Sequence, residues 1–200
     1  MFTIVSNWHG AMYEPMALLV LPNRRDYAVQ HGYEAREFNC PGHYGKITAL
    51  LNSWGSGFEW LWWLDVDAII TRPELRIEEV LDGHLVDGVD VLIGCDHNGI
   101  NAGSMFLRCS DEVRRCLVSC LDRRQKFDFP PFHDQLAIGC MLWNLYDKVR
   151  VIPRQLHNAY PGEWTGKDFV LHTPMVSQQE RLNLLRWRLE GLANRDSQNS

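Results

Sequence analysis

The sequence predicts an α/β fold, in which one central, mostly parallel, Rossmann-like sheet is covered by helices. Short apolar runs alternate with helix-patterned segments through the first half of the chain. The run "EWLWWL" at 59–64 is apolar along almost its whole length, which is typical of a parallel strand covered on both faces. The chain has 200 residues, 46% of them hydrophobic and 22% charged, which suits a single domain with a sizeable core.

The first half of the chain alternates strand, helix, strand, helix, strand. Gly32 follows the first helical segment as a stop signal, and the second has its apolar residues on one helical face. This alternation is the signature of parallel strands joined by crossover helices. The expected elements are a strand at 2–6, a helix at about 14–31, a strand at 33–38, a helix at about 44–54 and a strand at 58–64.

The second half continues with strands and helices whose order is less regular. Pro73 is expected at the start of a short helix, and the segment 133–146 is apolar almost all round, which predicts a buried helix. We expect one catalytic domain at 1–192 and a polar tail at 193–200. The expected elements are a helix at 72–81, strands at 90–96 and 103–109, helices at about 111–124 and 133–146, strands at 148–153 and 167–173, and an amphipathic helix at 178–192.

Charge and composition exclude some function classes. The formal net charge is −5, with 20 basic and 25 acidic residues and no basic stripe, so we do not expect a nucleic-acid partner. The basic pairs Arg24–Arg25, Arg114–Arg115 and Arg123–Arg124 are interpreted as solvated helix faces. The six cysteines lack C-x-x-C spacing and are interpreted as small buried hydrophobes in a reducing compartment.

The sequence shows neither a signal peptide nor an apolar run of membrane-spanning length. The start "MFTIVSNWHG" has no basic region and no cleavage site, and "MALLVLP" is too short to cross a bilayer. We therefore expect a cytoplasmic protein with no membrane span.

Two acids, Asp65 and Asp67, follow the predicted central strand directly. If extended geometry persists, they point the same way at the carboxyl edge of the sheet, where open α/β folds bind ligands. Two such carboxylates repel each other, and a divalent cation such as Mn²⁺ or Mg²⁺ removes the conflict while keeping positions open for phosphates. The alternatives are that the acids cap a helix or pair with Arg72 and Arg76.

Several blocks of sequence, in order, resemble the GT-A fold glycosyltransferases, specifically the fungal galactosyl/mannosyltransferase and plant xyloglucan xylosyltransferase family. The resemblance spans residues 1 to about 175 and implies a GT-A type sheet and a D-x-D motif. The blocks are "RRDYAVQHGYE", "YGKITALLNS", "EWLWWLDVDAII", "GINAGSMFLR", "HDQLAI" and "EWTGKDFVLH".

The resemblance implies a metal site made by Asp65, Asp67 and His172, with Asp67 as the more direct ligand of Mn²⁺ or Mg²⁺. A lone histidine at a strand end is otherwise more often a hydrogen-bonded structural residue. The family also has a lysine soon after the histidine, which is missing here, so either Arg181 substitutes for it or the phosphates rely more on the metal and on backbone groups.

The resemblance also implies residues for a nucleotide-sugar donor, with a UDP-linked sugar expected. Near the base or ribose it implies backbone groups of Thr3, Val5 and Asn7, and near the rest of the donor it implies Lys46, Asp65, Asn101 and Gly103. Without the resemblance, a lysine on a helix face is usually solvated and Asn101 belongs to an ordinary turn between two strands.

Asp134 and Gln135 match the family's D-Q pair, and the resemblance implies that they lie near the anomeric carbon of the donor. N-capping of the following helix is the structural alternative for Asp134. A carboxylate beside C1 stabilises an oxocarbenium-like transition state. The resemblance implies retention, by front-face attack or through a covalent intermediate on Asp134.

The sequence thus predicts a metal-dependent glycosyltransferase that moves a sugar from a UDP-sugar to a hydroxyl of a glycan acceptor. One alternative is a catalytically silent sugar-binding protein of the same fold. Another is a metal-dependent phosphatase, although an aspartyl phosphatase would carry its acid pair after the first strand and this chain carries it after the third.

Overall fold

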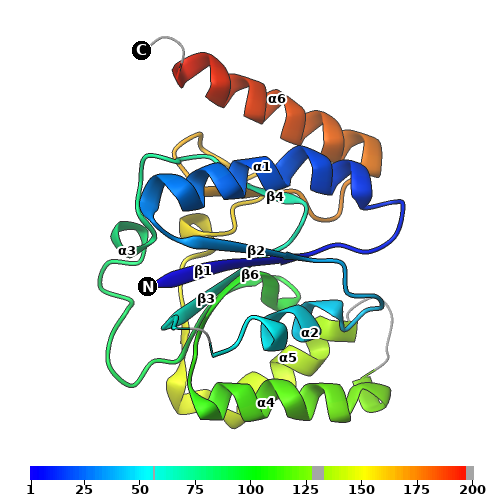
Figure 1. The fold of residues 1–200 in the computed structure, drawn as a ribbon, viewed down its shortest axis with the longest axis vertical. Helices are drawn as coiled ribbons and strands as arrows, with labels where there is room; N and C mark the ends of the chain where they lie inside the picture. Colours follow the sequence, from blue (N-terminus) through cyan, green and yellow to red (C-terminus); the bar gives the residue numbers. More distant parts are fainter. Residues whose placement is uncertain (56, 128–132, 197–200) are drawn as a thin grey trace.

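The structure, a computed structural model, describes residues 1–55, 57–127 and 133–196. In it a central sheet is sandwiched between helices (Figure 1). The helices are α1 (Glu14–His31), α2 (Gly45–Asn52), α3 (Ile77–Val80), α4 (Asp111–Asp122), α5 (His133–Asn144) and α6 (Gln178–Asp196).

The strands form a six-stranded mixed sheet and a separate two-stranded sheet. The large sheet has the order β2-β1-β3-β6-β5-β7, in which β1 pairs parallel with β2 and β3, and β6 runs antiparallel to both of its neighbours. The strands are β1 (Phe2–Asn7), β2 (Glu34–Phe38), β3 (Trp60–Leu64), β4 (Ala68–Ile70), β5 (Val91–Asp96), β6 (Gly99–Arg108), β7 (Val149–Val151) and β8 (Val170–His172).

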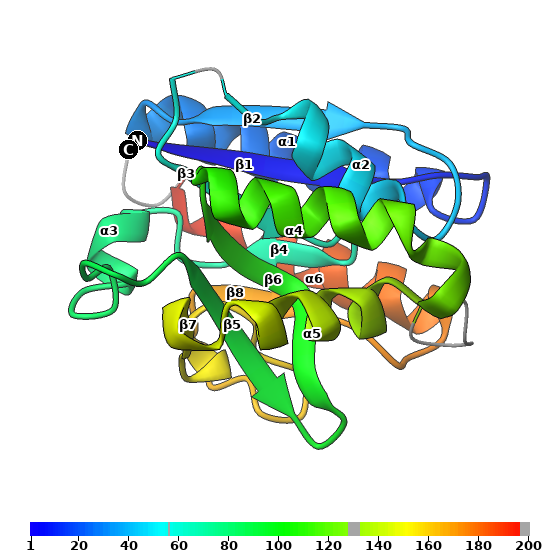
Figure 2. The same ribbon diagram turned by 90° about the horizontal axis from the view of Figure 1, so that it is seen from below.

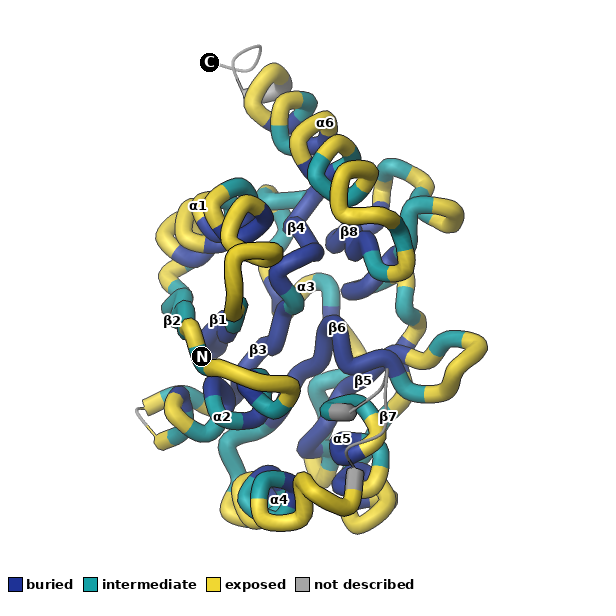
Figure 3. The backbone as a smooth tube through the Cα atoms, turned by 90° about the vertical axis from the view of Figure 1, so that its right-hand side faces the viewer, coloured by how far each residue is buried: buried dark blue, intermediate teal, exposed yellow. Residues whose placement is uncertain are grey.

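Strand β3 lies at the centre of the sheet and is buried on both faces. Successive side chains of a strand point to opposite faces. Trp60, Trp62 and Leu64 belong to one core cluster, while Leu61 and Trp63 belong to the other. The continuous apolar run of the sequence is therefore explained by cover on both faces. Figure 3 shows β3 in the dark blue of buried residues.

Helices α1 and α6 lie on one side of the sheet, and α2, α4 and α5 lie on the other (Figures 1 and 2). The small sheet of β4 and β8 lies on the α1 and α6 side, where Ile69 and Leu171 pack with the inner face of α1 and with Leu185 of α6. Among the described residues no helix combines the length and apolar character needed to cross a bilayer.

Most elements predicted from sequence are confirmed. Helix α1 has the predicted bounds and ends at Gly32, whose φ of 71° is the left-handed conformation that glycine adopts readily. The second strand and most later strands lie within their predicted ranges, but β6 begins at Gly99 and not at Gly103, and the short strand β4 was not predicted. The predicted tail is helical through Asp196 as part of α6, and residues 197–200 lie outside the described residues.

Three predictions of local structure were wrong. The helix expected at 72–81 is only Ile77–Val80, because the preceding residues close a turn in which the amide of Leu75 donates to the carbonyl of Arg72. Helix α5 is not buried all round, since Trp143 is 81% exposed. The cysteines are free, but Cys95 and Cys140 are exposed and only Cys120 is fully buried, so the group is not a set of core hydrophobes.

Candidate active site

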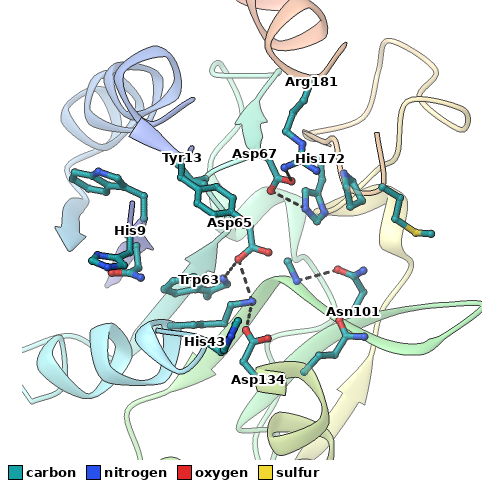
Figure 4. A pocket seen from close by; sticks show the side chains of 18 of the residues that line it. His9, Tyr13, His43, Trp63, Asp65, Asp67, Asn101, Asp134, His172 and Arg181 are labelled. Atoms are coloured by element: carbon teal, nitrogen blue, oxygen red, sulfur yellow. Dashed lines mark hydrogen bonds and ion pairs between the residues drawn. The ribbon is translucent and has the colours of Figure 1, made fainter. Parts of the chain in front are cut away.

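A cavity of about 710 Å³ opens at the carboxyl ends of β1 and β3, where β6 begins (Figure 4). This size suits a small-molecule ligand. Its wall includes the acid pair, the start of α5 and the end of β8, so segments far apart in the sequence meet at one edge of the sheet. Figure 4 shows Asp65, Asp67, Asp134 and His172 pointing toward this space.

The acid pair lies in a tight turn between β3 and β4, and not on a continued strand. The amide of Ala68 donates to the carbonyl of Asp65 over 3.0 Å, which closes the turn. Extended geometry therefore does not persist past Leu64, contrary to the sequence-based expectation. Both carboxylates nevertheless face the same cavity.

Arg24 of α1 supports this turn through hydrogen bonds to its backbone carbonyl groups. Its guanidinium donates to the carbonyl of Leu64 at 3.0 Å, to that of Ala68 at 2.9 Å, and to the carbonyl of Asp65. Arg24 is 1% exposed, and burial lowers its pKa to about 10, which still leaves it charged near neutral pH. Its interpretation as part of a solvated helix face was wrong; its neighbour Arg25 is the exposed one.

Asp67 lies in a buried group of charged and polar side chains. Its Oδ1 lies 3.1 Å from Nε2 of His172, and its Oδ2 lies 3.4 Å from Nη1 of Arg181. The pairing of β4 with β8 sets Ala68 opposite His172, which brings the end of the turn to the end of β8. Burial alone raises the pKa of Asp67, but His172 and Arg181 outweigh that effect and lower it.

Asp65 belongs to a second group, on the other side of the cavity. Its Oδ1 accepts from the indole nitrogen of Trp63 at 2.7 Å and lies 3.1 Å from Nζ of Lys46. The same Nζ lies 3.1 Å from Oδ2 of Asp134 and donates to the carbonyl of Ala102 at 2.8 Å. The buried ammonium group of Lys46 thus forms ion pairs with two carboxylates, those of Asp65 and Asp134.

The electrostatics of this second group follow from its burial. Burial raises the pKa of Asp65, Lys46 opposes that rise, and the nearby Asp67 adds to it. Burial lowers the pKa of Lys46, but Asp134 and Asp65 outweigh it, so the ammonium form is retained. The cavity therefore has more carboxylates than cations close to them, which favours a bound cation.

The donor set of Asp65, Asp67 and His172 fits a divalent cation. One ligand atom from each lies within 4.8 Å of the others. Two carboxylates and one imidazole suit Mn²⁺. Mg²⁺ prefers oxygen ligands, so it suits the two carboxylates better than the imidazole. The alternative pairing of the acids with Arg72 and Arg76 does not occur, since these arginines pair with Glu74 and Glu78.

Gly103 makes room for the histidine. A Cβ atom on this residue would lie 2.2 Å from Cε1 of His172, a separation that real structures do not show. The backbone of β6 therefore has to be glycine at this point for the imidazole to reach the acid pair. The carbonyl of Gly103 also accepts from the amide of Asp65 at 2.8 Å, which ties the acid turn to β6.

The structure brings most of the predicted site residues together at the cavity, although their roles stay predictions. Thr3 and Val5 lie inside the core, with exposed fractions of 0%, and do not line it. The side chain of Asn7 pairs with the backbone of Cys40, through 3.1 Å and 2.7 Å hydrogen bonds. The predicted residues that line the cavity are Asn7, Lys46, Asp65, Asp67, Asn101, Gly103, Asp134, Gln135 and His172.

Sequence reasoning missed several residues of the site. Asp96 at the end of β5 carried the same signal as the acid pair, a carboxylate at a strand end. Asn158 and Tyr160 follow a short turn and have no periodic pattern that marks them. Trp63 looked like one more core residue of an apolar strand, but its indole nitrogen orients Asp65.

Sequence comparison identifies relatives of this chain. Residues 2–86 match the model of the galactosyl transferase GMA12/MNN10 family. An alpha-1,2-galactosyltransferase of Schizosaccharomyces pombe is 29% identical, over 73% of this chain and 51% of that protein. A probable alpha-1,2-galactosyltransferase gmh1 of the same yeast is 23% identical, over 75% of this chain and 60% of that protein. The chain thus spans about half of the length of these relatives.

Comparison with solved structures identifies the fold. A glycosyltransferase involved in the glycosylation of the major capsid of PBCV-1 superposes with a TM-score of 0.82 at 14% identity, over 93% of this chain and 98% of that one. The galactosyltransferase LgtC, solved with donor and acceptor sugar analogues, gives 0.60 at 12% identity, over 93% and 95%. By sequence similarity the chain is thus a relative of the galactosyl transferase GMA12/MNN10 family, and by structural similarity it has the GT-A fold of glycosyltransferases.

Proposed function

We propose that this chain transfers a sugar from a UDP-linked donor to a hydroxyl group of a glycan acceptor, with retention of the anomeric configuration. The observation that carries the proposal is the cluster of Asp65, Asp67 and His172 at the wall of a cavity of about 710 Å³. The lysine-paired carboxylate of Asp134 lines the same cavity.

In this proposal Asp65, Asp67 and His172 hold Mn²⁺ or Mg²⁺, which supplies Lewis-acid stabilisation to the departing diphosphate. Arg181 lines the same cavity and adds a cationic group for phosphate oxygens. Its Nε is fixed by a 2.9 Å hydrogen bond to the carbonyl of Thr173. It is therefore the residue that we assign in place of the lysine that this chain lacks after His172.

We assign Asp134 to the reacting carbon of the sugar. The bond from C1 to the diphosphate oxygen breaks while a bond from C1 to the acceptor oxygen forms, and the proton of the acceptor hydroxyl passes to the departing diphosphate. A carboxylate near C1 stabilises the positive charge that develops there. Lys46 keeps Asp134 fixed on the side facing Asp65, and Gln135 is held by a 3.3 Å hydrogen bond from the amide of Ala102.

UDP-galactose is the donor that we propose to test first. Relatives of this chain are named alpha-1,2-galactosyltransferases, and one GT-A structure with a TM-score of 0.50 is titled as a complex with manganese, UDP-Gal and xylobiose. An α-linked product from an α-linked donor means retention.

The test is calorimetric titration of the purified chain with UDP and with UDP-galactose, with and without Mn²⁺. We expect binding that needs the metal and that disappears in Asp67→Asn, which removes one anionic ligand at constant shape. Asp87→Asn is the matched control, because Asp87 is exposed and lies outside the cavity. Absence of metal-dependent nucleotide binding in the wild type would refute the proposal.

A transfer assay with labelled UDP-galactose and a panel of mannose- and galactose-terminated oligosaccharides completes the test. Formation of a labelled glycan supports the proposed reaction, and the anomeric configuration of the product reports retention. Tight nucleotide binding without transfer to any acceptor, and without donor hydrolysis, would instead identify a sugar-binding protein.

A further inference from the structure

A continuous chain of buried side chains leads away from His172. Its Nδ1 lies 2.6 Å from Oδ1 of Asn158, and Nδ2 of Asn158 lies 2.7 Å from Oδ1 of Asn101. Nδ2 of Asn101 in turn donates to Oδ2 of Asp96 at 2.9 Å. Asn158 and His172 are 0% and 3% exposed, so solvent has little access to these polar groups.

The orientation of the Asn101 side-chain amide is fixed by two neighbouring groups, of which one can only donate a hydrogen bond and the other can only accept one. The backbone amide of Gly103 only donates, and it lies 2.9 Å from Oδ1 of Asn101. The carboxylate of Asp96 only accepts, and it receives Nδ2 of Asn101 together with the hydroxyl of Tyr160 at 2.6 Å. The amide oxygen of Asn101 therefore has to face Gly103 and Asn158.

The direction of the next two hydrogen bonds follows. Asn158 meets the oxygen of Asn101 and has to present its amide nitrogen there, so its own oxygen faces His172. An oxygen in that position needs a hydrogen on Nδ1 of the imidazole. The backbone holds this arrangement, since the amide of His172 donates to the carbonyl of Ala159 at 2.8 Å, next to Asn158.

We propose that Asn158 is a positioning residue that holds His172 in the tautomer with its hydrogen on Nδ1, so that Nε2 keeps its lone pair for a cation at the acid pair. The tautomer follows from the hydrogen-bond chain alone, whereas its use for metal binding rests on the proposed function. Asn158 is not a ligand and does not touch the cavity space assigned to the donor.

The competing arrangement shows why such a residue is needed. Nε2 of His172 lies 3.1 Å from Oδ1 of Asp67. Without an acceptor at Nδ1, the neutral ring gains most by placing its hydrogen on Nε2 and donating it to that carboxylate. The bond would place a hydrogen on the nitrogen that the metal needs, so His172 would be lost as a donor, and Oδ1 of Asp67 would be engaged at the same time. Partners of this kind, on the far side of a ligating histidine, typically contribute about 10- to 100-fold in metal affinity.

The first experiment determines the tautomer in the metal-free protein. Histidine is labelled with ¹⁵N, and long-range proton–nitrogen NMR spectra are recorded at alkaline pH, with the His172 signals assigned by their loss in His172→Gln. We expect a protonated Nδ1 and an unprotonated Nε2 in the wild type. A protonated Nε2 in the wild type would overturn the proposal, whatever the chain does with a sugar nucleotide.

Three variants complete the test. Asn158→Leu keeps the approximate volume but removes the acceptor, and we expect the hydrogen to move to Nε2 and Mn²⁺ affinity to fall about 10- to 100-fold. Asn158→Asp keeps an acceptor oxygen and is expected to keep the wild-type tautomer. Asn144→Leu is the control, because Asn144 is exposed and bonds only to the carbonyl of Cys140 in its own helix among the described contacts.

The outcomes separate the two proposals. An unchanged tautomer in folded Asn158→Leu refutes the role of Asn158. If that variant does not fold, the wild-type and Asn158→Asp spectra still decide the tautomer. If the wild type has the expected tautomer but Mn²⁺ and Mg²⁺ both fail to bind, the inference about Asn158 stands and the metal assignment in the proposed function fails.

Discussion

The imidazole of His172 fills the space that a side chain on Gly103 would need, because a Cβ atom on the glycine would lie 2.2 Å from Cε1 of the imidazole and 2.7 Å from its Nδ1. The imidazole ring packs closely against the backbone of β6 at Gly103, and its Nε2 reaches Asp67 from there. Room for His172, a proposed metal ligand, thus comes from a strand that lies much earlier in the sequence.

The change Gly103→Ala is therefore expected to displace His172 and to weaken Mn²⁺ binding by at least about 10-fold, as loss of a metal ligand's support does. The measurement is a Mn²⁺ titration followed by calorimetry or electron paramagnetic resonance. Gly139→Ala is the control, because a Cβ on Gly139 of α5 would meet only Ile100, at an ordinary 3.9 Å. Equal Mn²⁺ affinity in the two variants would show that the ring can move without cost.

Lys46→Met is expected to destabilise the fold and to slow transfer. It leaves Asp65 and Asp134 beside each other without their ammonium partner. Because Asp65 is partly exposed, we expect a loss of about 2 kcal/mol in the free energy of unfolding at pH 7, below the range for fully buried pairs. Urea denaturation measures it.

The pH dependence of this loss has a definite sign. Lys46 lowers the pKa of Asp65 against the effect of burial, so the pKa rises further when the ammonium is removed. Protonation then relieves the repulsion, and the destabilisation should shrink as the pH falls toward about 4. Lys167→Met, at an exposed lysine, should show neither effect. A loss that is constant with pH would mean that Lys46 contributes by packing.

The order of the elements was predictable from the sequence because it depends on local patterns. Helix α1 has a clear stop signal at Gly32, and the uninterrupted apolar run of β3 predicts that the strand is buried on both faces. The acid pair stood out because a buried strand usually ends in a turn with residues such as Gly, Asn or Pro, and not in two carboxylates. The antiparallel direction of β6 and the short strand β4 were not predictable, since three residues give no measurable period.

The long-range contacts between side chains of the candidate site could not be predicted from the sequence alone. Lys46 and Asp134 are 88 positions apart, since 134 − 46 = 88, and nothing in either helix marks the other as its partner. Asn158 lies between a short 3₁₀ helix, Arg154–Leu156, and strand β8, in a segment with no periodic pattern, and its role depends on the orientation of Asn101. Arg24 and Arg25 look alike in sequence, and only tertiary packing decides that the first is buried.

Arg24→Met tests how the acid turn is held. The thioether fills much of the space but donates no hydrogen bond, so the buried carbonyls of Leu64 and Ala68 lose a charged donor. We expect a loss of about 3 kcal/mol in the free energy of unfolding, as for several hydrogen bonds to a charged group. Weaker Mn²⁺ binding should accompany it.

Arg25→Met is the matched control for this change. Arg25 forms an exposed ion pair with Glu37, which contributes little because both partners can be solvated. If the two variants lose the same stability, the turn does not depend on the guanidinium of Arg24. If Arg24→Met is destabilised but binds Mn²⁺ normally, the turn keeps its shape without this support.

His157 is expected to make the protein sensitive to acid. It is fully buried beside β6, where Nδ1 lies 3.0 Å from the hydroxyl of Ser104 and Nε2 has no hydrogen-bond partner among the described residues. Burial lowers its pKa from an ordinary 6.5 to about 3, and the positive charge of Arg154 adds to this effect. The folded protein therefore keeps this ring neutral at pH values at which the unfolded chain binds a proton.

The sign of the effect follows from that difference. The stabilisation is complete above the unfolded pKa of 6.5 and is lost as the pH falls toward the folded pKa of about 3. Each pH unit in this window corresponds to about 1.4 kcal/mol, so about 2 kcal/mol should be lost between pH 6.5 and pH 5. His157→Gln removes the titrating group, and the difference between wild type and variant, measured by urea denaturation at both pH values, isolates the contribution of His157. His97→Gln, at an exposed histidine, should leave the pH dependence as in the wild type. If the stability of His157→Gln falls with acid as steeply as that of the wild type, the ring accepts a proton in the folded state, and the buried site must then contain a partner for it.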